Sequence, residues 1–247
     1  GENSLVWVVA VLVAGRIIAC AIHALYAWSL LPSIQGNFFF RKDLIKSLCV
    51  SGGWMSVSNI ISPLMSYADR FVVGILLSSN AVAYYATPQE IVSKLGIIPG
   101  ALTAILFPQF STHFVKSQVD FKKTYYRSII SLAVLLLFPV LVLSFWAEKI
   151  LSMWISPEFA AQSWMLLVIL SWGMYVACLA TIPFTVIQSA GNARLTALLH
   201  LFEFPLFFGM LYGFISFFGI IGAAMAWAFR NLIDAILLFY YSKKYVQ

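Results

Sequence analysis

Residues 51–112 read SGGWMSVSNIISPLMSYADRFVVGILLSSNAVAYYATPQEIVSKLGIIPGALTAILFPQFST, two long apolar runs separated by a short polar turn. A helix needs about 20 apolar residues to cross roughly 30 Å of hydrocarbon, and each run is longer than that. Yet Asp69 and Arg70 lie inside the first run, and Glu90 and Lys94 inside the second. Ionisable side chains at that depth cost about 3 kcal/mol each, so they face a partner or a water-filled cavity. The stretch predicts a helical hairpin that forms one wall of a polar pathway.

The composition of the whole chain is that of an integral membrane protein. Of its 247 residues, 62% are hydrophobic and 10% charged, and the mean hydropathy is +0.93. Soluble domains carry about 25% charged residues. The net charge of +6 does not point to nucleic acid, because the basic residues are not gathered on one face. The three cysteines and three histidines are isolated in sequence, so we expect no disulfide, no metal and no other cofactor.

Seven apolar segments follow one another along the chain, and each predicts one membrane-spanning helix. They cover about residues 4–31, 48–77, 81–111, 128–146, 163–188, 195–217 and 222–241. Pro63, Pro88 and Pro99 lie inside the second and third spans, where they remove backbone donors and bend the helices. The connector 32–47 mixes aromatic and basic residues as an interfacial amphipathic segment does, and an ordinary loop fits it equally well.

The basic residues sort by connector. With seven crossings, alternate connectors lie on opposite sides of the membrane. The loops expected at 113–127 and 147–162 therefore fall on different sides. Trp154 is expected to anchor the second loop at the membrane interface. One side then receives only Lys149. The other receives Arg41, Lys42, Lys46, Lys116, Lys122, Lys123, Arg127, Arg194, Lys243 and Lys244. Under the positive-inside rule this second group is cytoplasmic, which places the N-terminus of this chain outside and its C-terminus inside.

The first and last spans resemble each other. The shift that aligns Arg16 with Arg230 also aligns Tyr26 with Tyr240, and transporters are commonly built from such repeats. We therefore expect about five further helices upstream of this chain. The expected domains are 1–31, the last helix of an N-terminal lobe; 32–47, a cytoplasmic amphipathic connector; and 48–247, a six-helix C-terminal lobe.

Polar residues recur at helical spacing on three of the predicted spans. The stripes are Asn59, Ser62, Ser66 and Asp69 on the second span, Tyr84, Thr87, Glu90 and Lys94 on the third, and Ser171, Tyr175, Cys178, Thr181, Thr185 and Gln188 on the fifth. Steps of three and four residues place the members of each stripe on one helix face. A single hydroxyl is better suited to helix packing in a membrane than to a ligand. Together, however, the stripes predict three helices that present polar groups along one side.

The charged residues of the hairpin admit two interpretations. Arg70 and Glu90 should lie at similar depth, since each is about two turns from the polar turn that joins the spans. They can form a structural ion pair across the hairpin. Alternatively, Arg70 and Lys94 offer positive charge to an anionic substrate while Asp69 and Glu90 orient them, and the planar fork of arginine suits phosphate.

Other intramembrane charges extend the set of candidates. Arg230 and Asp234 lie one turn apart and can pair, whereas Arg16 has no acidic residue one turn away and is left available for a ligand. Glu203 has no charged partner in its span, and burial would favour its protonated form, so it is a candidate to carry a coupling proton. The candidate cavity residues are therefore Arg16, Arg70, Lys94, Arg230, Asp69, Glu90, Asp234 and Asn59.

The sequence offers no support for enzymatic chemistry. It contains no arrangement of nucleophile and base, no metal-ligand spacing and no glycine loop that could cradle a phosphate. We therefore expect a protein that is not an enzyme.

Residues 51–112 resemble the start of a lobe in the O-antigen and polysaccharide flippases of the multidrug/oligosaccharidyl-lipid/polysaccharide (MATE-like) exporter superfamily. The cues are DRF at 69–71, AYY at 83–85 and LFPQFS at 106–111. The resemblance implies an all-α bundle of two six-helix lobes around a central cavity. It also implies alternating access that moves an undecaprenyl-pyrophosphate-linked sugar unit from the cytoplasmic to the outer leaflet. This chain would supply the last helix of the first lobe and the whole second lobe.

The hypothesis that follows is a lipid-linked oligosaccharide flippase of a bacterial inner membrane. Its expected partners are the anionic lipid-linked oligosaccharide, membrane lipids, the preceding helices of the same protein and other glycan-assembly membrane proteins, without nucleic acid. One alternative is a cation-coupled drug exporter of the same superfamily, although acidic and basic residues within the spans are equal in number. Another is a multi-span glycan polymerase or ligase, which would need a large outer loop, whereas the longest outer connector is the short one at 148–162.

Overall fold

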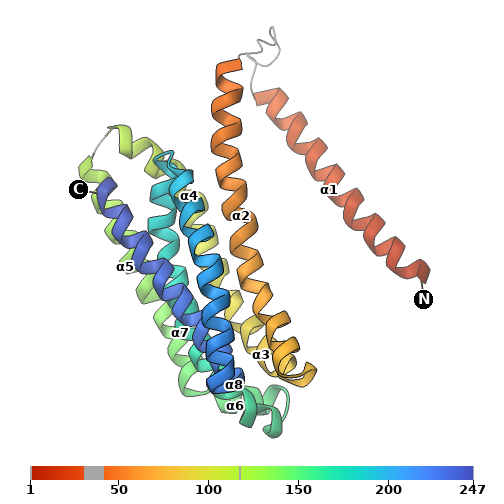
Figure 1. Ribbon diagram of the computed structural model, residues 1–247. Helices are drawn as coiled ribbons and strands as arrows, with labels where there is room; N and C mark the ends of the chain where they lie inside the picture. The colour runs from red at the N-terminus through yellow and green to blue at the C-terminus, as the bar shows by residue number, and fades with distance from the viewer. Residues whose placement is uncertain (1, 31–41, 117, 247) are drawn as a thin grey trace. The chain divides into compact units, whose positions relative to one another are not determined.

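The computed structural model describes residues 2–30, 42–116 and 118–246, and the elements within them are all helices (Figure 1). In chain order they are α1 (Glu2–Leu30), α2 (Lys42–Leu76), α3 (Ser79–Ser93), the short 3₁₀ helix η2 (Lys94–Gly96), α4 (Ile97–Lys116), α5 (Gln118–Phe145), α6 (Ala147–Trp154), α7 (Pro157–Ser189) and α8 (Ala193–Val246).

Within the described residues, five helical segments are long and apolar enough to cross a membrane. They are Val6–Leu30, Ser79–Thr112, Gln118–Phe145, Pro157–Ser189 and Ala193–Val246. The last is 54 residues long and consists of two helical limbs that meet at Gly219. The remaining predicted span lies in α2, which is 35 residues long. All seven apolar segments are thus helical, and the chain is an all-α membrane protein, as predicted.

The chain forms two compact units, Gly1–Ser47 and Leu48–Gln247. In the first unit the described side chains of α1, residues 6–30, are all exposed. The connector predicted at 32–47 falls mostly on residues 31–41, which lie outside the described residues, while 42–47 form the first turns of α2. The division into an N-terminal lobe helix, a connector and a C-terminal lobe stays a prediction.

Two segments predicted as loops are helical instead. Residues 113–116 belong to the end of α4 and residues 118–127 to the start of α5, while residues 147–154 form α6 and residues 157–162 start α7. Hydropathy marks where the apolar layer ends, but a helix can continue beyond it because long basic side chains extend toward water from a helical backbone. The prediction of loops here was therefore wrong.

One helix start in this region carries a recognisable signal. Ser156 caps α7, since its Oγ accepts a hydrogen bond from the backbone N–H of Phe159 at 3.2 Å, and Pro157 occupies the first turn. Serine followed by proline is a preferred helix start. Trp154, expected as an interface anchor, ends α6 with an exposed side chain.

The bend predicted for the third span is present at η2, between α3 and α4. Pro99 follows this turn and cannot donate to the carbonyl of Leu95, four residues earlier, which interrupts the regular helix. A Cβ on Gly96 would lie 2.9 Å from Cε of Met174, the flexible end of a side chain on α7, so the turn lies close to α7. By contrast, Pro63 and Pro88 lie inside α2 and α3, which continue through them.

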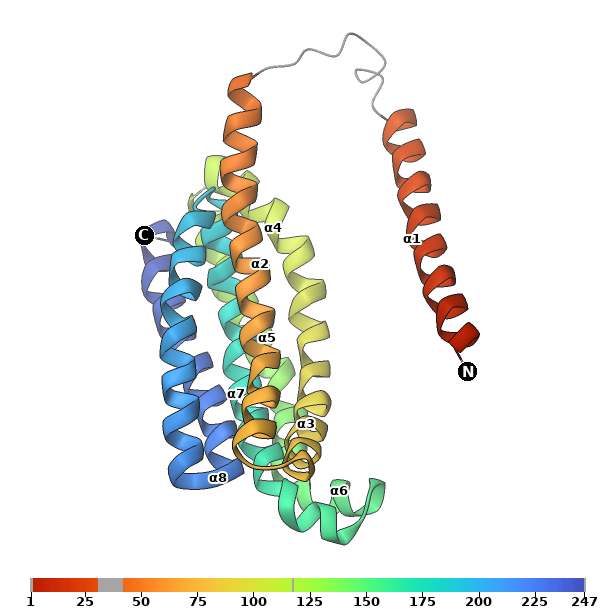
Figure 2. The same cartoon turned by 45° about the vertical axis from the view of Figure 1, so that its right-hand side comes forward.

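A sharp turn divides α8 into a first limb, residues 193–218, and a second limb, residues 220–246. Gly219 has φ 59° and ψ −138°, a backbone conformation that is essentially restricted to glycine. A Cβ on Gly222 would lie 2.0 Å from the carbonyl oxygen of Phe214, so glycine is required there as well. The two limbs consequently run side by side in opposite directions (Figures 1 and 2).

The core of the second unit is built around α7, which contacts α3, α4, α5, α6 and α8. Its side chains Leu166, Leu167 and Leu170 are completely buried. A Cβ on Gly173 would lie 2.9 Å from the Trp227 ring and 3.0 Å from Ala228, so the missing side chain lets α7 and the second limb of α8 pack closely. This packing fixes the positions of the helices that surround the cavity described next.

Candidate functional site

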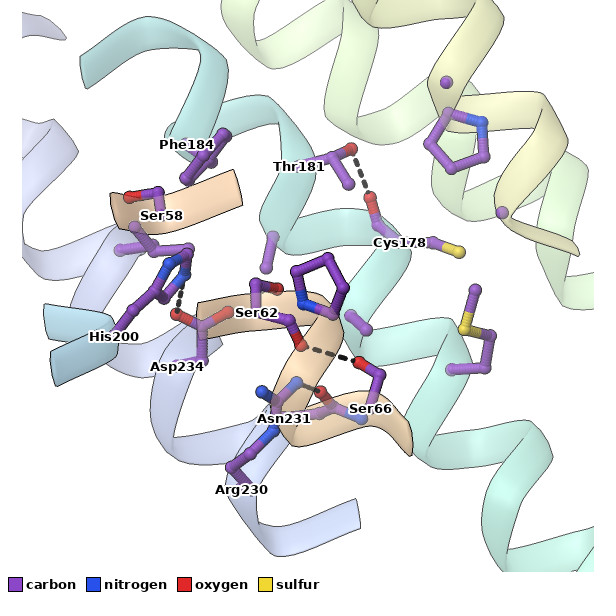
Figure 3. Close-up of a pocket in the computed structure, with 18 of the residues that line it drawn as sticks. Ser58, Ser62, Ser66, Cys178, Thr181, Phe184, His200, Arg230, Asn231 and Asp234 are labelled. Carbon is purple, nitrogen blue, oxygen red and sulfur yellow. Dashed lines mark hydrogen bonds and ion pairs between the residues drawn. The ribbon is translucent and has the colours of Figure 1, made fainter. Parts of the chain in front are cut away.

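A cavity of about 570 Å³ lies in the second unit between α2, the η2–α4 region, α7 and both limbs of α8 (Figure 3). Its wall combines apolar side chains with hydroxyl, amide, imidazole and charged groups. The polar lining residues are Ser58, Asn59, Ser62, Ser66, Thr103, Cys178, Thr181, Trp227, His200, Arg230, Asn231 and Asp234. Residues of α2 and of the η2–α4 region form part of this wall, so the stretch 51–112 contributes to a polar cavity, but its four charged residues do not line it.

The polar stripe of α2 divides between two places. Asn59, Ser62 and Ser66 line the cavity, as their shared helix face predicts, and Ser66 Oγ donates to the Ser62 carbonyl at 3.0 Å. Asp69 is absent from the cavity wall and is completely buried against α3. On α7, Cys178 and Thr181 belong to the wall. The α2 face therefore supplies the cavity with amide and hydroxyl groups, whereas the Asp69 carboxylate contacts α3.

Asp69 accepts three hydrogen bonds in the interface between α2 and α3. Tyr85 Oη donates to Asp69 Oδ2 at 2.7 Å, Gln89 Nε2 donates to the same oxygen at 2.8 Å, and the backbone N–H of Arg70 donates to Oδ1 at 2.8 Å. Gln89 Nε2 also reaches the Ser66 carbonyl at 3.2 Å. A buried carboxylate is stable when its oxygens are satisfied in this way. This group joins the two helices tightly.

The ion pair predicted across the hairpin is present. Arg70 Nη2 contacts Glu90 Oε1 at 2.7 Å, and Arg70 Nε donates to Gln89 Oε1 at 2.7 Å. Lys94 Nζ lies 3.6 Å from Glu90 Oε2, with both side chains at least half exposed. Arg70, Glu90 and Lys94 do not line the cavity. Of the two interpretations left open by the sequence, this geometry supports the structural one; we call Asp69, Arg70, Tyr85, Gln89 and Glu90 the hairpin clamp.

Arg230 is the arginine that lines the cavity within the described residues. It is 7% exposed, donates from Nη2 to Asn231 Oδ1 at 2.6 Å, and lies 3.6 Å from Met65 Sδ through Nη1. Its guanidinium lies 5.8 Å from the Phe207 ring centroid, and Nε has no partner. The pair with Asp234 that the spacing suggested is replaced by the bond to Asn231. Arg230 thus brings a positive charge and an unpaired Nε to a wall that mixes polar and apolar side chains.

Asp234 instead faces His200 and Glu203 from the first limb of α8. His200 Nε2 lies 4.0 Å from Asp234 Oδ1, and one ligand atom from each of the three residues lies within 4.8 Å of the others. Glu203 is 1% exposed, and neither of its carboxylate oxygens has a hydrogen-bond partner. The sequence named Glu203 and Asp234 as separate candidates and did not single out His200, because Asp234 meets the other two residues only across the turn at Gly219.

Arg16 belongs to a different unit from the cavity residues. Arg16 lies on α1, in the unit Gly1–Ser47, with an exposed side chain, and stays a candidate on sequence grounds. The polar cavity residues that the sequence did not single out are Ser58, Thr103, His200, Trp227 and Asn231. Asn231 could have been found from its position beside Arg230, because an amide next to a buried charge commonly satisfies it.

The fold and cavity define a class of protein: a multi-pass α-helical membrane protein with a polar cavity between its helices. The profile of the family described as "Polysaccharide biosynthesis protein" matches residues 4–161, well over half of the chain. The chain belongs to this family. The resemblance carried by the DRF, AYY and LFPQFS cues is confirmed.

Two curated relatives extend the match. The chain is 36% identical over 231 residues to a Shigella flexneri protein described as "Putative O-antigen transporter", covering 93% of this chain and 54% of the relative. It is 26% identical over 188 residues to the uncharacterized membrane protein EpsK of Bacillus subtilis (strain 168), covering 74% of this chain and 36% of that relative. The chain thus spans about half the length of the first relative and about a third of the second.

Proposed function

We propose that this chain forms one side of a pathway that moves a lipid-linked oligosaccharide across a bacterial inner membrane by alternating access. The cargo would be an undecaprenyl-pyrophosphate-linked repeat unit of an O-antigen or related polysaccharide, reoriented without covalent change. Family membership, the transporter description of the Shigella relative and the polar cavity support this proposal. The helices of a second lobe of the same protein, and other glycan-assembly membrane proteins, are the proposed partners.

The observation that carries the proposal is the position of Arg230. A pyrophosphate group has several anionic oxygens, and an arginine fork binds two such oxygens at once. Arg230 lines the cavity, is held over Phe207 and has an unpaired Nε. In surroundings of low polarity its attraction for an anion is much stronger than in water. We assign it the role of contacting the anionic head of the cargo.

The remaining polar groups of the wall suit sugar hydroxyls. A hydroxyl both donates and accepts, and the cavity offers amides, hydroxyls and an indole N–H. Trp227 Nε1 and Asn231 Nδ2 are buried donors without a partner, and Asn59 and Ser62 add groups from α2. A set of neutral donors and acceptors around one positive charge fits a glycan carried on an anionic lipid.

The test is glycan export by cells whose sole copy of the full-length gene carries Arg230→Gln. Removing a hydrogen bond to a charged group costs about 1.5–3 kcal/mol, so surface glycan should fall roughly ten- to hundredfold. Arg127→Gln is the matched control, since Arg127 is exposed near the start of α5 and should leave export unchanged. Membrane fractionation checks that both variants insert equally. Export by Arg230→Gln at the control level would contradict the proposal.

A vesicle assay separates transport from the other classes. With purified protein and a labelled lipid-linked glycan, we expect the label to change leaflet and the glycan to keep its length. A joined or lengthened glycan would identify a polymerase or ligase. Protection of cells from cationic drugs without any glycan movement would identify a drug exporter.

A further inference from the structure

The three-residue cluster of His200, Glu203 and Asp234 has features that glycan transport does not require. We propose that it binds one divalent transition-metal ion of the Zn²⁺ class. Ligand atoms from all three residues lie within 4.8 Å of one another. The cluster contributes one imidazole and two carboxylates, a donor set that such ions accept.

The local structure orients these groups toward one point. His200 and Glu203 are three residues apart on the first limb of α8, which places them on the same helix face. Asp234 approaches from the second limb (Figure 3). The His200 ring stacks on Phe184 with centroids 5.8 Å apart and planes inclined by 17°, which restricts its rotation. Two limbs of one helix therefore supply a convergent ligand set.

The ligand atoms are buried without partners, which is costly unless something binds them. His200 is 6% exposed and Glu203 1% exposed. Both oxygens of Glu203 and Asp234 Oδ1 make no hydrogen bond, and His200 Nε2 faces Asp234 Oδ1 at 4.0 Å. Bonds of about 2.1 Å to a tetrahedral ion would set the ligand atoms about 3.4 Å apart. Small side-chain rotations would close the present separations to that value.

The charges of the cluster match a divalent ion. If both carboxylates lose their protons when the ion binds, their two negative charges balance its two positive charges. Arg230, four residues before Asp234 on the second limb, donates to the neutral side chain of Asn231 and so keeps its positive charge near the cluster. An imidazole ligand favours Zn²⁺, Co²⁺ or Ni²⁺ over Na⁺, Mg²⁺ and Ca²⁺, which prefer oxygen. His200 and Asp234 line the cavity whereas Glu203 does not, so an ion would enter from the cavity and meet Glu203 last.

Co²⁺ absorption spectroscopy of the purified chain in detergent, stripped of metals with a chelator, tests the site. We expect one Co²⁺ per chain with visible bands of nitrogen and oxygen ligation, displaced by an equivalent of Zn²⁺. His200→Gln, Glu203→Gln and Asp234→Asn should each weaken binding at least tenfold. His23→Gln and Glu148→Gln are the matched controls, because they make the same chemical changes at exposed positions.

A second measurement does not depend on the variants. Zn²⁺ at a hundredfold excess over its dissociation constant should raise the unfolding temperature of the wild-type chain, because a ligand that binds the folded state stabilises it. Three results would each overturn the proposal: no Co²⁺ or Zn²⁺ binding at millimolar concentration, equal binding by all folded variants, or displacement of Co²⁺ by equimolar Na⁺ or Ca²⁺.

Discussion

At the scale of single residues, the hairpin clamp and the cavity use the same side-chain types for different purposes. Arg70 is held by Gln89 and Glu90 outside the cavity, whereas Arg230 keeps one donor free within its wall. The difference lies in the partners that each guanidinium meets. A mid-span arginine in the sequence is therefore only a candidate until its partners on neighbouring helices are known.

The clamp yields a prediction about stability. Asp69→Ala would leave Tyr85 Oη without an acceptor in a buried interface, which costs about 1–3 kcal/mol, and would leave Gln89 Nε2 with the Ser66 carbonyl as its acceptor. We expect a lower unfolding temperature in detergent, measured by loss of helicity on heating. The matched variant is Glu90→Ala, at a half-exposed ion pair that contributes about 0.2–1 kcal/mol. Equal losses for the two variants would show that the Asp69 bonds contribute little.

The sequence predicted part of the candidate site because some contacts follow from local spacing. The face shared by Asn59, Ser62 and Ser66 follows from helical periodicity, and the Arg70–Glu90 pair follows from the short turn between two helices. His200 and Asp234 could not be paired in this way. Their contact depends on the register of two limbs that pack only after a turn whose direction is set by backbone geometry.

At the scale of helices, packing through glycine should control the cavity walls. Gly173→Val would place a branched side chain where even a Cβ lies 2.9 Å from Trp227 and 3.0 Å from Ala228. We expect overpacking to separate α7 from α8 at a cost of about 1–3 kcal/mol, seen as a lower unfolding temperature. Gly209→Val is the control, because a Cβ there meets nothing within 4 Å. A stable Gly173→Val protein would contradict the close packing.

The turn of α8 gives a second prediction at this scale. Gly219→Ala forces a side chain into a backbone conformation that costs about 1–3 kcal/mol outside glycine. We expect reduced thermal stability relative to Gly213→Ala, a helical position where a Cβ meets open space. Hydrogen exchange of the α8 amides should locate the loosened region. Identical unfolding of the two variants would argue against strain at Gly219.

Hydropathy predicted where the apolar helices lie but not where they end. The bend before Pro99 and the turn at Gly219 carry sequence signals, because proline lacks a donor and glycine alone tolerates the backbone angles. The sequence signals for the helix α6 and for the extension of α4 to Lys116 are weaker. Such polar extensions are stabilised by backbone hydrogen bonds that any side chain permits.

At the scale of the whole molecule, the distribution of basic residues predicts the orientation in the membrane. Cysteines introduced by Lys243→Cys and Lys149→Cys, in a background where Cys20, Cys49 and Cys178 are replaced by alanine, should be reached from opposite sides. A thiol reagent that cannot cross membranes should label the first in inverted vesicles and the second in intact spheroplasts. Labelling of both from one side would refute this topology.

The turn at Gly219 has a mechanical consequence for the proposed metal site at His200, Glu203 and Asp234. Glu203 lies about 16 residues from that glycine, roughly 24 Å along the limb at 1.5 Å per residue. Over such a lever arm, an angular opening of about 5° shifts the far end by about 2 Å, which is comparable to a whole metal–ligand bond. An ion bound between the two limbs of α8 would restrict the angle between them. Spin labels on the two limbs should then report a narrower spread of distances with Zn²⁺ than with a chelator.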